Sequence, residues 1–323
     1  MDRVSKSHAI ELLADILQPI SHWLKAENVQ EIMINGPDDV WVEESGMSSK
    51  VDVELDAMTI SSAIDVLARI VGKTADKDGP TAIIDARLEG LRFAAALETV
   101  ATKGPSICIR RHHPVVLTLE DYLASGGIDQ AQLELIHTAV LNRKNFIISG
   151  GTSSGKTTFL NAAIGLIPTR ERVISIEDTR EINVKAPNWV AFEANEQAGI
   201  TIRHLVKLAL RYRPDRIVVG EVRGPEAFDL MQAMNTGHDG GFATIHANSA
   251  RDALARLEGL VLTCDIGWPL DAIRDQVGRT FDYVVHLERG NVDGVRRVVE
   301  IAEIHGYDHD HRDYHFKLLK GRL

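Results

Sequence analysis

The chain has 323 residues, of which 44% are hydrophobic and 25% are charged, a composition typical of a soluble globular protein large enough for two domains. Aspartate and glutamate total 46 and lysine and arginine total 36, so the formal net charge is −10. This acidic balance argues against direct nucleic-acid binding, because sequence-independent binding depends on clustered positive charge. No apolar run approaches the roughly 20 residues that cross a bilayer, so we expect a cytoplasmic protein whose membrane association, if any, is peripheral.

The first 112 residues mix helical and strand patterns, which predicts a small α+β domain. Apolar residues repeat with helical spacing over residues 7–18, where Ser7 is a candidate N-cap, and again over residues 60–71. Strands are expected over residues 31–34, 40–43, 82–85, 92–97 and 106–110. The pattern stops at the run His112-His113-Pro114, because proline offers no donor to a sheet and restricts the residue before it. We therefore expect a linker over residues 113–120.

From residue 121 to the end, strands alternate with helices. The expected strands are 145–149, 172–176, 216–219 and 242–245. The expected helices are 157–167, 201–211, 225–234 and 249–262. Such alternation predicts an α/β domain, with a mostly parallel sheet that carries helices on its faces.

Residues 150–157 read Gly-Gly-Thr-Ser-Ser-Gly-Lys-Thr and match the phosphate-binding loop G-x-x-x-x-G-K-[ST] between an apolar strand and a helix. The glycines let backbone N–H groups surround phosphates, and the helix presents its positive end to them. We expect Lys156 to reach the β- and γ-phosphates and the Thr157 hydroxyl to bind Mg²⁺. The candidate nucleotide-binding residues of the loop are Gly150, Gly151, Thr152, Ser153, Ser154, Gly155, Lys156, Thr157 and Thr158.

Three other strand ends carry candidate catalytic residues. Glu221 ends an apolar strand where ligands sit in open α/β sheets, and it is the candidate Mg²⁺ ligand; Gly220 before it stands where many P-loop proteins have aspartate. Glu177 ends another strand and is the candidate group that polarises the attacking water. His246 follows a glycine-rich turn and is a candidate γ-phosphate sensor. Acidic strand ends and single histidines are also common structural features, so each of these assignments competes with a structural role.

Taken together, the motifs resemble those of the secretion (traffic) ATPases. Residues 174–181 look like their Asp box, 213–224 like their Walker B region, and 240–248 like their His box; residues 29–37 and 85–111 resemble their N-domain. The resemblance is greatest to the type IV secretion branch, especially the TrbB-type (P-type) conjugative transfer ATPases. Type II secretion ATPases usually carry a four-cysteine zinc insert, which the two cysteines of this chain cannot form.

The resemblance implies a RecA-like P-loop motor domain behind a smaller α+β domain. It further implies Mg²⁺-dependent ATP hydrolysis by a homohexameric ring that powers type IV secretion or conjugative transfer, with pilus biogenesis and substrate transport as outputs. Partners would be inner-membrane components of that machine. N-domain arginines would approach the phosphates of ATP, and the candidates are Arg87, Arg92, Arg110 and Arg111.

Several alternatives stay open at this stage. The ATPase of tight-adherence (Flp) pili is closely related, and a RecA-like DNA translocase shares the core, although the net charge disfavours a DNA channel. A GTPase would need an N-K-x-D element, which is absent, and a small-molecule kinase would need lid arginines. Four histidines near the end fit no standard metal site and predict a solvated terminal segment: His305, His309, His311 and His315.

Overall fold

The computed structural model describes residues 3–44, 46–88, 90–111, 117–195, 198–290 and 294–320. The chain divides into two compact units, Met1–Pro114 and Val115–Leu323. Residues 112–116, where the sequence predicts the boundary and the start of the linker, lie outside the described residues. Within the described ranges, no helix combines the length and the apolar character needed to cross a membrane.

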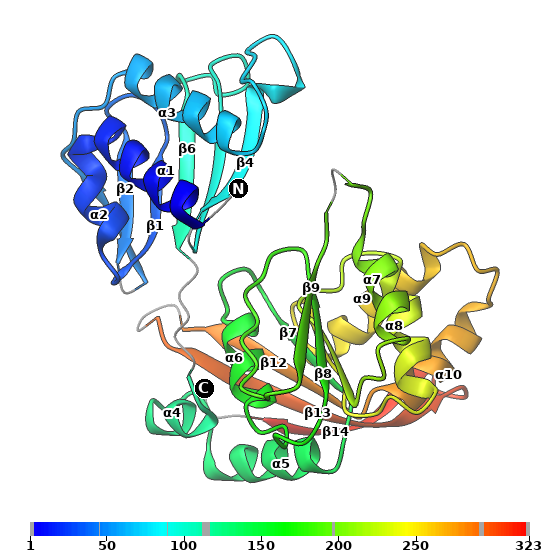
Figure 1. Cartoon of the computed structure of the whole chain (residues 1–323). Coiled ribbons are helices and arrows are strands. Elements are labelled where there is room, and N and C mark those ends of the chain that lie inside the picture. The colour runs from blue at the N-terminus through cyan, green and yellow to red at the C-terminus, as the bar shows by residue number, and fades with distance from the viewer. Residues whose placement is uncertain are drawn as a thin grey trace. The chain divides into compact units, whose positions relative to one another are not determined.

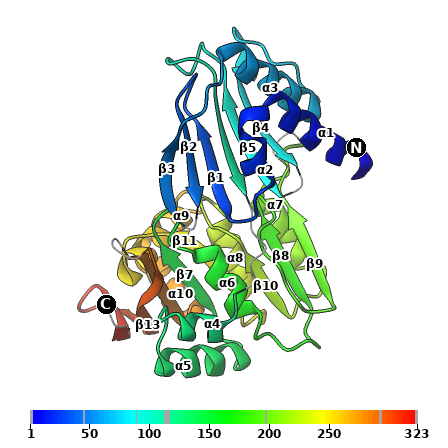
Figure 2. The same ribbon diagram turned by 90° about the vertical axis from the view of Figure 1, so that its left-hand side faces the viewer.

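The N-terminal unit is an antiparallel sheet with helices on one face (Figures 1 and 2). The strand order is β3-β2-β1-β6-β5-β4. The strands are β1 (Val29–Ile34), β2 (Val40–Glu44), β3 (Met47–Val51), β4 (Ile83–Leu88), β5 (Leu91–Ala96) and β6 (Ser106–Arg111). The helices are α1 (Arg3–Ile16), α2 (Ser21–Lys25) and α3 (Ala57–Ile70). The predicted α+β unit is therefore present.

Apolar faces of α1 and α3 pack on the sheet and form one core. Leu13 of α1 and Ile60, Ile64 and Leu67 of α3 are almost fully buried in it. Asp56 caps α3, because its side chain accepts a hydrogen bond from the Thr59 backbone N–H at 2.7 Å. The α1 helix begins at Arg3, so the prediction that Ser7 caps it was wrong; Ser7 lies inside the helix.

The C-terminal unit contains an eight-stranded sheet in the order β14-β13-β12-β7-β11-β10-β8-β9. The strands are β7 (Phe146–Gly150), β8 (Val173–Glu177), β9 (Trp189–Glu193), β10 (Arg216–Val219), β11 (Phe242–His246), β12 (Tyr283–Arg289), β13 (Arg296–Asp308) and β14 (Asp313–Lys320). Neighbours from β12 to β9 pair in parallel, and β13 and β14 extend the sheet as an antiparallel hairpin. The predicted mostly parallel sheet is confirmed.

Helices cover both faces of this sheet (Figure 1). They are α4 (Leu119–Ala124), α5 (Gln130–Leu141), α6 (Lys156–Ile164), α7 (Ile202–Ala209), α8 (Glu226–Asn235), α9 (Ala250–Leu262) and α10 (Leu270–Thr280). One core lies under α7 to α10 and the other under α4 to α6. Ile147 faces the first core and Ile148 the second, which explains why β7 is apolar at successive positions.

A buried polar network fixes the turn before β11. The Asn145 side-chain oxygen accepts hydrogen bonds from the backbone N–H groups of Gly240 and Gly241, at 2.7 and 2.9 Å. Arg216 is fully buried, donates to the Gly240 carbonyl at 3.2 Å and pairs with Glu171 at 2.6 Å. A side chain on Gly240 would collide with Arg216. The glycine turn that leads to His246 is thus held by its neighbours, because buried ionic and amide groups must be paired.

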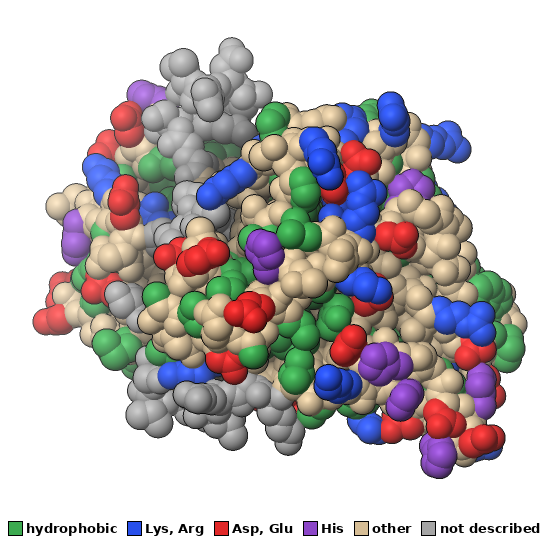
Figure 3. All heavy atoms as spheres, turned by 90° about the horizontal axis from the view of Figure 1, so that it is seen from below, with side chains coloured by type: hydrophobic (Ala, Val, Ile, Leu, Met, Phe, Trp, Pro, Cys, Tyr) green, Lys and Arg blue, Asp and Glu red, His purple; other side chains and the backbone are tan. Residues whose placement is uncertain are grey.

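The four C-terminal histidines are exposed, as expected of a solvated segment, but the segment that carries them forms regular strands, which the sequence did not predict. Residues 296–308 and 313–320 form the β13–β14 hairpin, in which Ile304 and Tyr314 are buried. The face seen from below carries histidine and acidic side chains together at one corner (Figure 3). His309 contacts Asp275 at 2.9 Å and His311 contacts Asp308 at 2.7 Å. Among the described residues, no group of three or more potential ligands is placed to hold a metal ion.

Candidate active site

The loop between β7 and α6 has the conformation expected of a phosphate-binding loop. Gly150, Ser153 and Gly155 have φ angles of 156°, 59° and 89°. A Cβ on Gly150 would come within 2.5 Å of the Leu287 carbonyl oxygen, so glycine is required there on steric grounds as well. The loop ends where α6 begins at Lys156, and its N–H groups therefore lie at a helix N-terminus that favours anions.

Lys156 lies across the mouth of this loop and is only 8% exposed. Its Nζ donates hydrogen bonds to the carbonyl oxygens of Gly150 and Gly151, at 3.0 and 2.7 Å. The same Nζ lies 3.4 Å from Nδ1 of His246. The Ser154 hydroxyl is buried and has no hydrogen-bond partner in the described structure. The loop thus contains a cation that is bonded to the loop's own carbonyls and a buried hydroxyl without a partner among the described groups.

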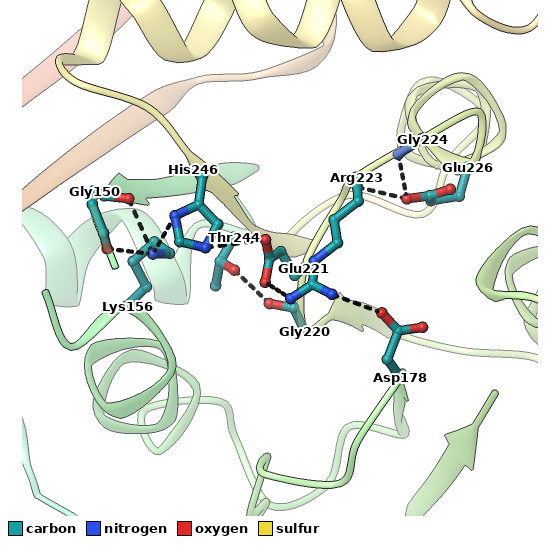
Figure 4. A network of polar contacts seen from close by, with 11 residues as sticks. Gly150, Lys156, Asp178, Gly220, Glu221, Arg223, Gly224, Glu226, Thr244 and His246 are labelled. Atoms are coloured by element: carbon teal, nitrogen blue, oxygen red, sulfur yellow. Dashed lines mark hydrogen bonds and ion pairs between the residues drawn. The ribbon is translucent and has the colours of Figure 1, made fainter. Parts of the chain in front are cut away.

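Charged side chains continue from Lys156 along the carboxyl ends of adjacent strands (Figure 4). His246, at the end of β11, lies with its Nε2 3.3 Å from Oε1 of Glu221, which follows β10. Arg223 pairs with Oε2 of Glu221 at 2.6 Å and with Asp178 at 3.5 Å. The parallel order β7-β11-β10-β8 explains this chain, because each strand delivers its end to the same edge of the sheet.

The surroundings of His246 determine the state of its ring. Burial and the positive charge of Lys156 lower the pKa of His246 below its ordinary value, although Glu221 opposes this effect. A neutral ring can accept a hydrogen bond from Lys156 at Nδ1 and donate one from Nε2 to Glu221. His246 therefore links the loop cation to the carboxylate without carrying charge at neutral pH.

Glu177 occupies a separate position at the end of β8. Its Oε1 accepts hydrogen bonds from the backbone N–H groups of Glu181 and Ile182, each at 2.8 Å, while Oε2 is buried with no partner among the described groups. Burial raises the pKa of Glu177 to about 7. Its hydrogen bonds go to its own loop and not to Lys156, Glu221 or His246.

The absence of a side chain at Gly220 leaves room for the side chain of Glu177. A Cβ at position 220 would come 2.9 Å from Cγ of Glu177, which lies next to it across the β8–β10 pair. An aspartate at position 220 would therefore displace Glu177. The glycine before Glu221, which departs from the usual P-loop pattern, accommodates the neighbouring carboxylate.

The threonines and serines of the loop occupy different environments. Thr152 and Ser153 are exposed at the loop, while Thr157 and Thr158 are half-buried in the first turn of α6. The Thr157 hydroxyl and the Glu221 carboxylate are oxygen ligands of the kind that Mg²⁺ prefers. The donor set of the site is therefore compatible with a Mg-nucleotide.

Three of the four candidate arginines of the N-terminal unit form a row across its sheet. Arg87 lies opposite Arg92, and Arg92 lies opposite Arg110, on the adjacent strands β4, β5 and β6. Cross-strand partners share a face, and this face is the one that α1 and α3 leave open. Arg92 also pairs with Asp85 at 2.6 Å.

Arg111 differs from the other three arginines. It follows Arg110 and therefore belongs to the opposite face of β6. Its Nη2 donates a hydrogen bond to the Leu24 carbonyl at 2.5 Å, and its Nε is buried without a partner in the described structure. The guanidinium of Arg111 is thus engaged with its own unit.

Two contacts in this region were not predicted from the sequence. Arg223 was visible in the Walker B segment, two residues after Glu221, but its role as a bridge to Asp178 depends on which strands are neighbours. Arg296 lies far along the chain and donates from Nε to the Ser153 carbonyl at 3.3 Å. No local pattern predicts the second contact, because it depends on the placement of the β12–β13 pair.

The fold and the site define a RecA-like P-loop motor domain, which follows a smaller α+β domain in the chain. Residues 14–289 match the family model described as Type II/IV secretion system protein. The conjugal transfer protein TrbB of Rhizobium radiobacter is 37% identical over 289 residues, which cover 88% of this chain and 86% of that protein. The type IV secretion system protein PtlH of Bordetella pertussis is 31% identical over 319 residues, which cover 88% of this chain and 93% of that protein.

A solved structure agrees with these relatives. The VirB11 ATPase of the Brucella suis type IV secretion system, solved in complex with sulphate, is 26% identical, with a TM-score of 0.51 and coverage of 91% of this chain and 97% of that one. The chain belongs to the Type II/IV secretion system protein family, among its type IV secretion and conjugal transfer ATPases. The resemblance stated from the sequence motifs is confirmed.

Proposed function

We propose that this protein hydrolyses ATP with Mg²⁺ as a homohexameric ring that powers type IV secretion or conjugative transfer, including pilus biogenesis and substrate transport. The observation that carries the proposal is the chain of contacts from Lys156 of the loop through His246 to Glu221. A cation, a histidine and a carboxylate beside one phosphate loop suit phosphoryl transfer to water. Membership of the family supports the secretion role.

The loop would hold the phosphates of ATP. The residues involved would be Gly150, Gly151, Thr152, Ser153, Ser154, Gly155, Lys156, Thr157 and Thr158. Lys156, which now contacts two loop carbonyls, would turn from them to the β- and γ-phosphates. Thr157 and Glu221 would hold Mg²⁺, which supplies charge neutralisation at the phosphates when bound.

Glu177 and His246 would act at the γ-phosphate end. Glu177 would orient the attacking water and accept its proton at Oε2, the buried oxygen that lacks a partner. Its raised pKa, about 7, suits a group that must accept a proton near neutral pH. The contact between Lys156 Nζ and His246 Nδ1 would change when Lys156 moves toward the phosphate. His246 would in this way sense whether the γ-phosphate is present.

Of the four arginines expected to contribute positive charge to the phosphates, Arg87, Arg92 and Arg110 would do so, whereas Arg111 is engaged with Leu24 of its own unit. These three arginines lie together on the face of the sheet that α1 and α3 leave open, where Asp85 pairs with Arg92 and Glu31 lies opposite Arg110. Closure of this unit on ATP, followed by release after hydrolysis, would supply the motion that a secretion machine uses.

The proposed partners are further copies of the chain and inner-membrane components of a type IV secretion or conjugation machine. We propose a cytoplasmic location, with peripheral association at the inner-membrane face. Direct binding to nucleic acid is not expected, because the net charge of −10 opposes it. The alternative is the ATPase of tight-adherence (Flp) pilus assembly, for which the same hydrolysis reaction is proposed.

Lys156→Ala tests the proposal. We expect phosphate release from ATP to be abolished with the fold intact, because the charge that stabilises the transferred phosphoryl group is lost. Lys207→Ala, at an exposed lysine whose Nζ lies 3.4 Å from Asp229, is the matched control and should behave as the parent. Phosphate release and circular dichroism measure both properties. A folded Lys156→Ala protein with near-parent turnover would falsify the proposal.

A further inference from the structure

An arginine contacts the P-loop on a side that the proposed mechanism does not use. Arg296 begins β13, and its Nε donates to the carbonyl of Ser153 at 3.3 Å. A Cβ on Gly155 would come within 2.5 Å of Cδ of Arg296, so the aliphatic stem of the arginine rests directly on this glycine. Glycine at position 155 is therefore needed both for its φ of 89° and for the approach of Arg296.

The strand order assigns Arg296 to one side of the loop. In the sheet, β7 lies between β11 and β12, and β13 follows β12. Lys156 leans toward His246 of β11, where the γ-phosphate is proposed to lie. Arg296 reaches the loop from the β12–β13 side. If the last phosphate of a bound nucleotide points toward β11, its sugar and base extend from the other side of the loop, toward Arg296.

Polar groups of Arg296 and of its neighbour Tyr122 lack hydrogen-bond partners in the described structure. Within the described part of the chain, the Nη1 and Nη2 groups of Arg296 have no hydrogen-bond partner. Tyr122 is 3% exposed, and its hydroxyl has no partner among the described groups. A Cβ on Gly127 would meet Tyr122 Cδ1 at 2.8 Å and the Arg296 carbonyl oxygen at 2.9 Å, which places both residues against the same glycine. An unpaired buried hydroxyl in a native protein calls for a partner.

We propose that Arg296 binds the nucleoside part of ATP, its sugar and base, through the guanidinium plane and the free Nη groups. This inference rests on the proposed function, since it assumes that the loop holds the phosphates. A guanidinium stacks on flat aromatic systems and donates hydrogen bonds in its plane, which suits a base and a ribose. The contact with Ser153 fixes the stem, so little side-chain freedom remains to be lost on binding.

The test compares nucleotides with a ligand that has phosphates but no nucleoside. Dissociation constants for ATP, ADP and inorganic tripolyphosphate are measured by calorimetry at fixed Mg²⁺ for the parent, Arg296→Ala and Arg296→Lys. We expect Arg296→Ala to bind ATP and ADP about tenfold more weakly and tripolyphosphate as the parent does. Arg296→Lys should lose most of the same affinity, because lysine has no planar fork. The KM for ATP should rise, whereas kcat should stay within about twofold of the parent value.

Arg297→Ala is the matched control. Arg297 is the next residue along β13 and belongs to the opposite face of the strand, so its replacement should leave nucleotide affinity unchanged. Equal weakening of ATP and tripolyphosphate, or a fall in kcat at saturating ATP, would show that Arg296 only braces the loop and would overturn the inference. Unchanged ATP affinity would overturn it as well. A parent that does not bind ATP would instead refute the proposed function.

Discussion

Glu177 is a carboxyl group held in an environment that opposes its ionisation. It is 3% exposed, and one of its two oxygens has no partner within the described structure. Desolvation raises its pKa to about 7, although two backbone N–H groups partly offset this effect by stabilising the charged form. In the unfolded chain the same group titrates near 4.5. The folded protein therefore binds the proton more tightly, and ionising Glu177 costs stability.

Glu177→Gln should abolish turnover and keep ATP affinity, because only the acceptance of the water proton is removed. In the parent, turnover should fall as pH drops through about 7, where Glu177 gains its proton. Pre-steady-state phosphate release and nucleotide titration measure the two effects. An equal loss of ATP binding would indicate instead that Glu177 ligates the metal, and the roles of Glu177 and Glu221 would be exchanged.

Glu177→Gln should also change how the folding stability of the protein depends on pH. Above pH 7 the parent holds a buried charge that the glutamine variant lacks. The stability of the parent relative to Glu177→Gln should therefore fall by about 3 kcal/mol as pH rises from about 4.5 to about 7, and should change little outside that window. Chemical denaturation at a series of pH values measures the difference.

At the scale of elements, the row Arg87–Arg92–Arg110 depends on the registers of three antiparallel strands. A shift of one residue in any pair would move one arginine to the face covered by α1 and α3. Acidic residues accompany the row, since Asp85 pairs with Arg92 at 2.6 Å and Glu31 lies opposite Arg110. The row nevertheless places three guanidinium groups on one open face, which is the geometry that the proposed contact with the phosphates of ATP requires.

Single Arg→Ala changes at positions 87, 92 and 110 test the row. We expect at least one to lower turnover on the order of 10³-fold, as removal of a phosphate-contacting arginine does. An arginine that only pairs with a surface carboxylate is worth about 0–1 kcal/mol in stability, and its loss should leave turnover unchanged. Arg69→Ala, on the exposed side of α3, is the control. If all three variants hydrolyse ATP at the parent rate, the row has no role in the reaction.

Arg111→Ala should have a different effect. The arginine donates to the Leu24 carbonyl, and its removal leaves that acceptor without this donor. We expect a lower thermal stability of the N-terminal unit with turnover close to that of the parent. Thermal unfolding and phosphate release separate this outcome from that of the row. A large loss of turnover with unchanged stability would instead give Arg111 the role proposed for the other three arginines.

The sequence predicted those elements whose local pattern is strong. The segments around the P-loop, including β7, β8, β10 and β11, were expected within a few residues of where they occur. The β9 strand was not predicted, because its residues are half-buried at the edge of the sheet and lack a strong apolar pattern. The β13–β14 hairpin was missed because histidines and aspartates mask its alternating apolar residues, Tyr314 among them.

The site was predictable as a set of residues but not as a set of contacts. The loop and three strand ends carry recognisable residue types, so Lys156, Glu221 and His246 could be chosen from the sequence. Their order in space follows from the crossover order of the strands, which no local pattern encodes. The Glu177–Gly220 contact has the same origin, since it joins two strands separated along the chain by β9 and α7.

At the scale of the whole molecule, the proposed ring makes a prediction about assembly. We expect the parent with ATP and Mg²⁺, or Glu177→Gln under the same conditions, to elute with the mass of six chains by size exclusion with light scattering. Trapping ATP should favour the ring, because ligand that binds the assembled state shifts the equilibrium toward it. With ATP added, Lys156→Ala should form less of the six-chain species than the parent does. A species that stays monomeric with saturating ATP would contradict the hexamer and favour a kinase or a GTPase.

The position of β7 in the sheet has a consequence for how the protein is made. Its two neighbours, β11 and β12, begin at residues 242 and 283, and Phe146 of β7 stacks on Phe242 at 5.0 Å and on Tyr283 at 5.4 Å. During synthesis at about 5–20 residues per second, this apolar strand leaves the ribosome well before either partner exists. The nascent chain therefore carries an unpaired strand that can aggregate, and chaperone protection would matter most in this interval. The N-terminal unit, whose strands all lie before residue 112, can complete its sheet while the rest is still being translated.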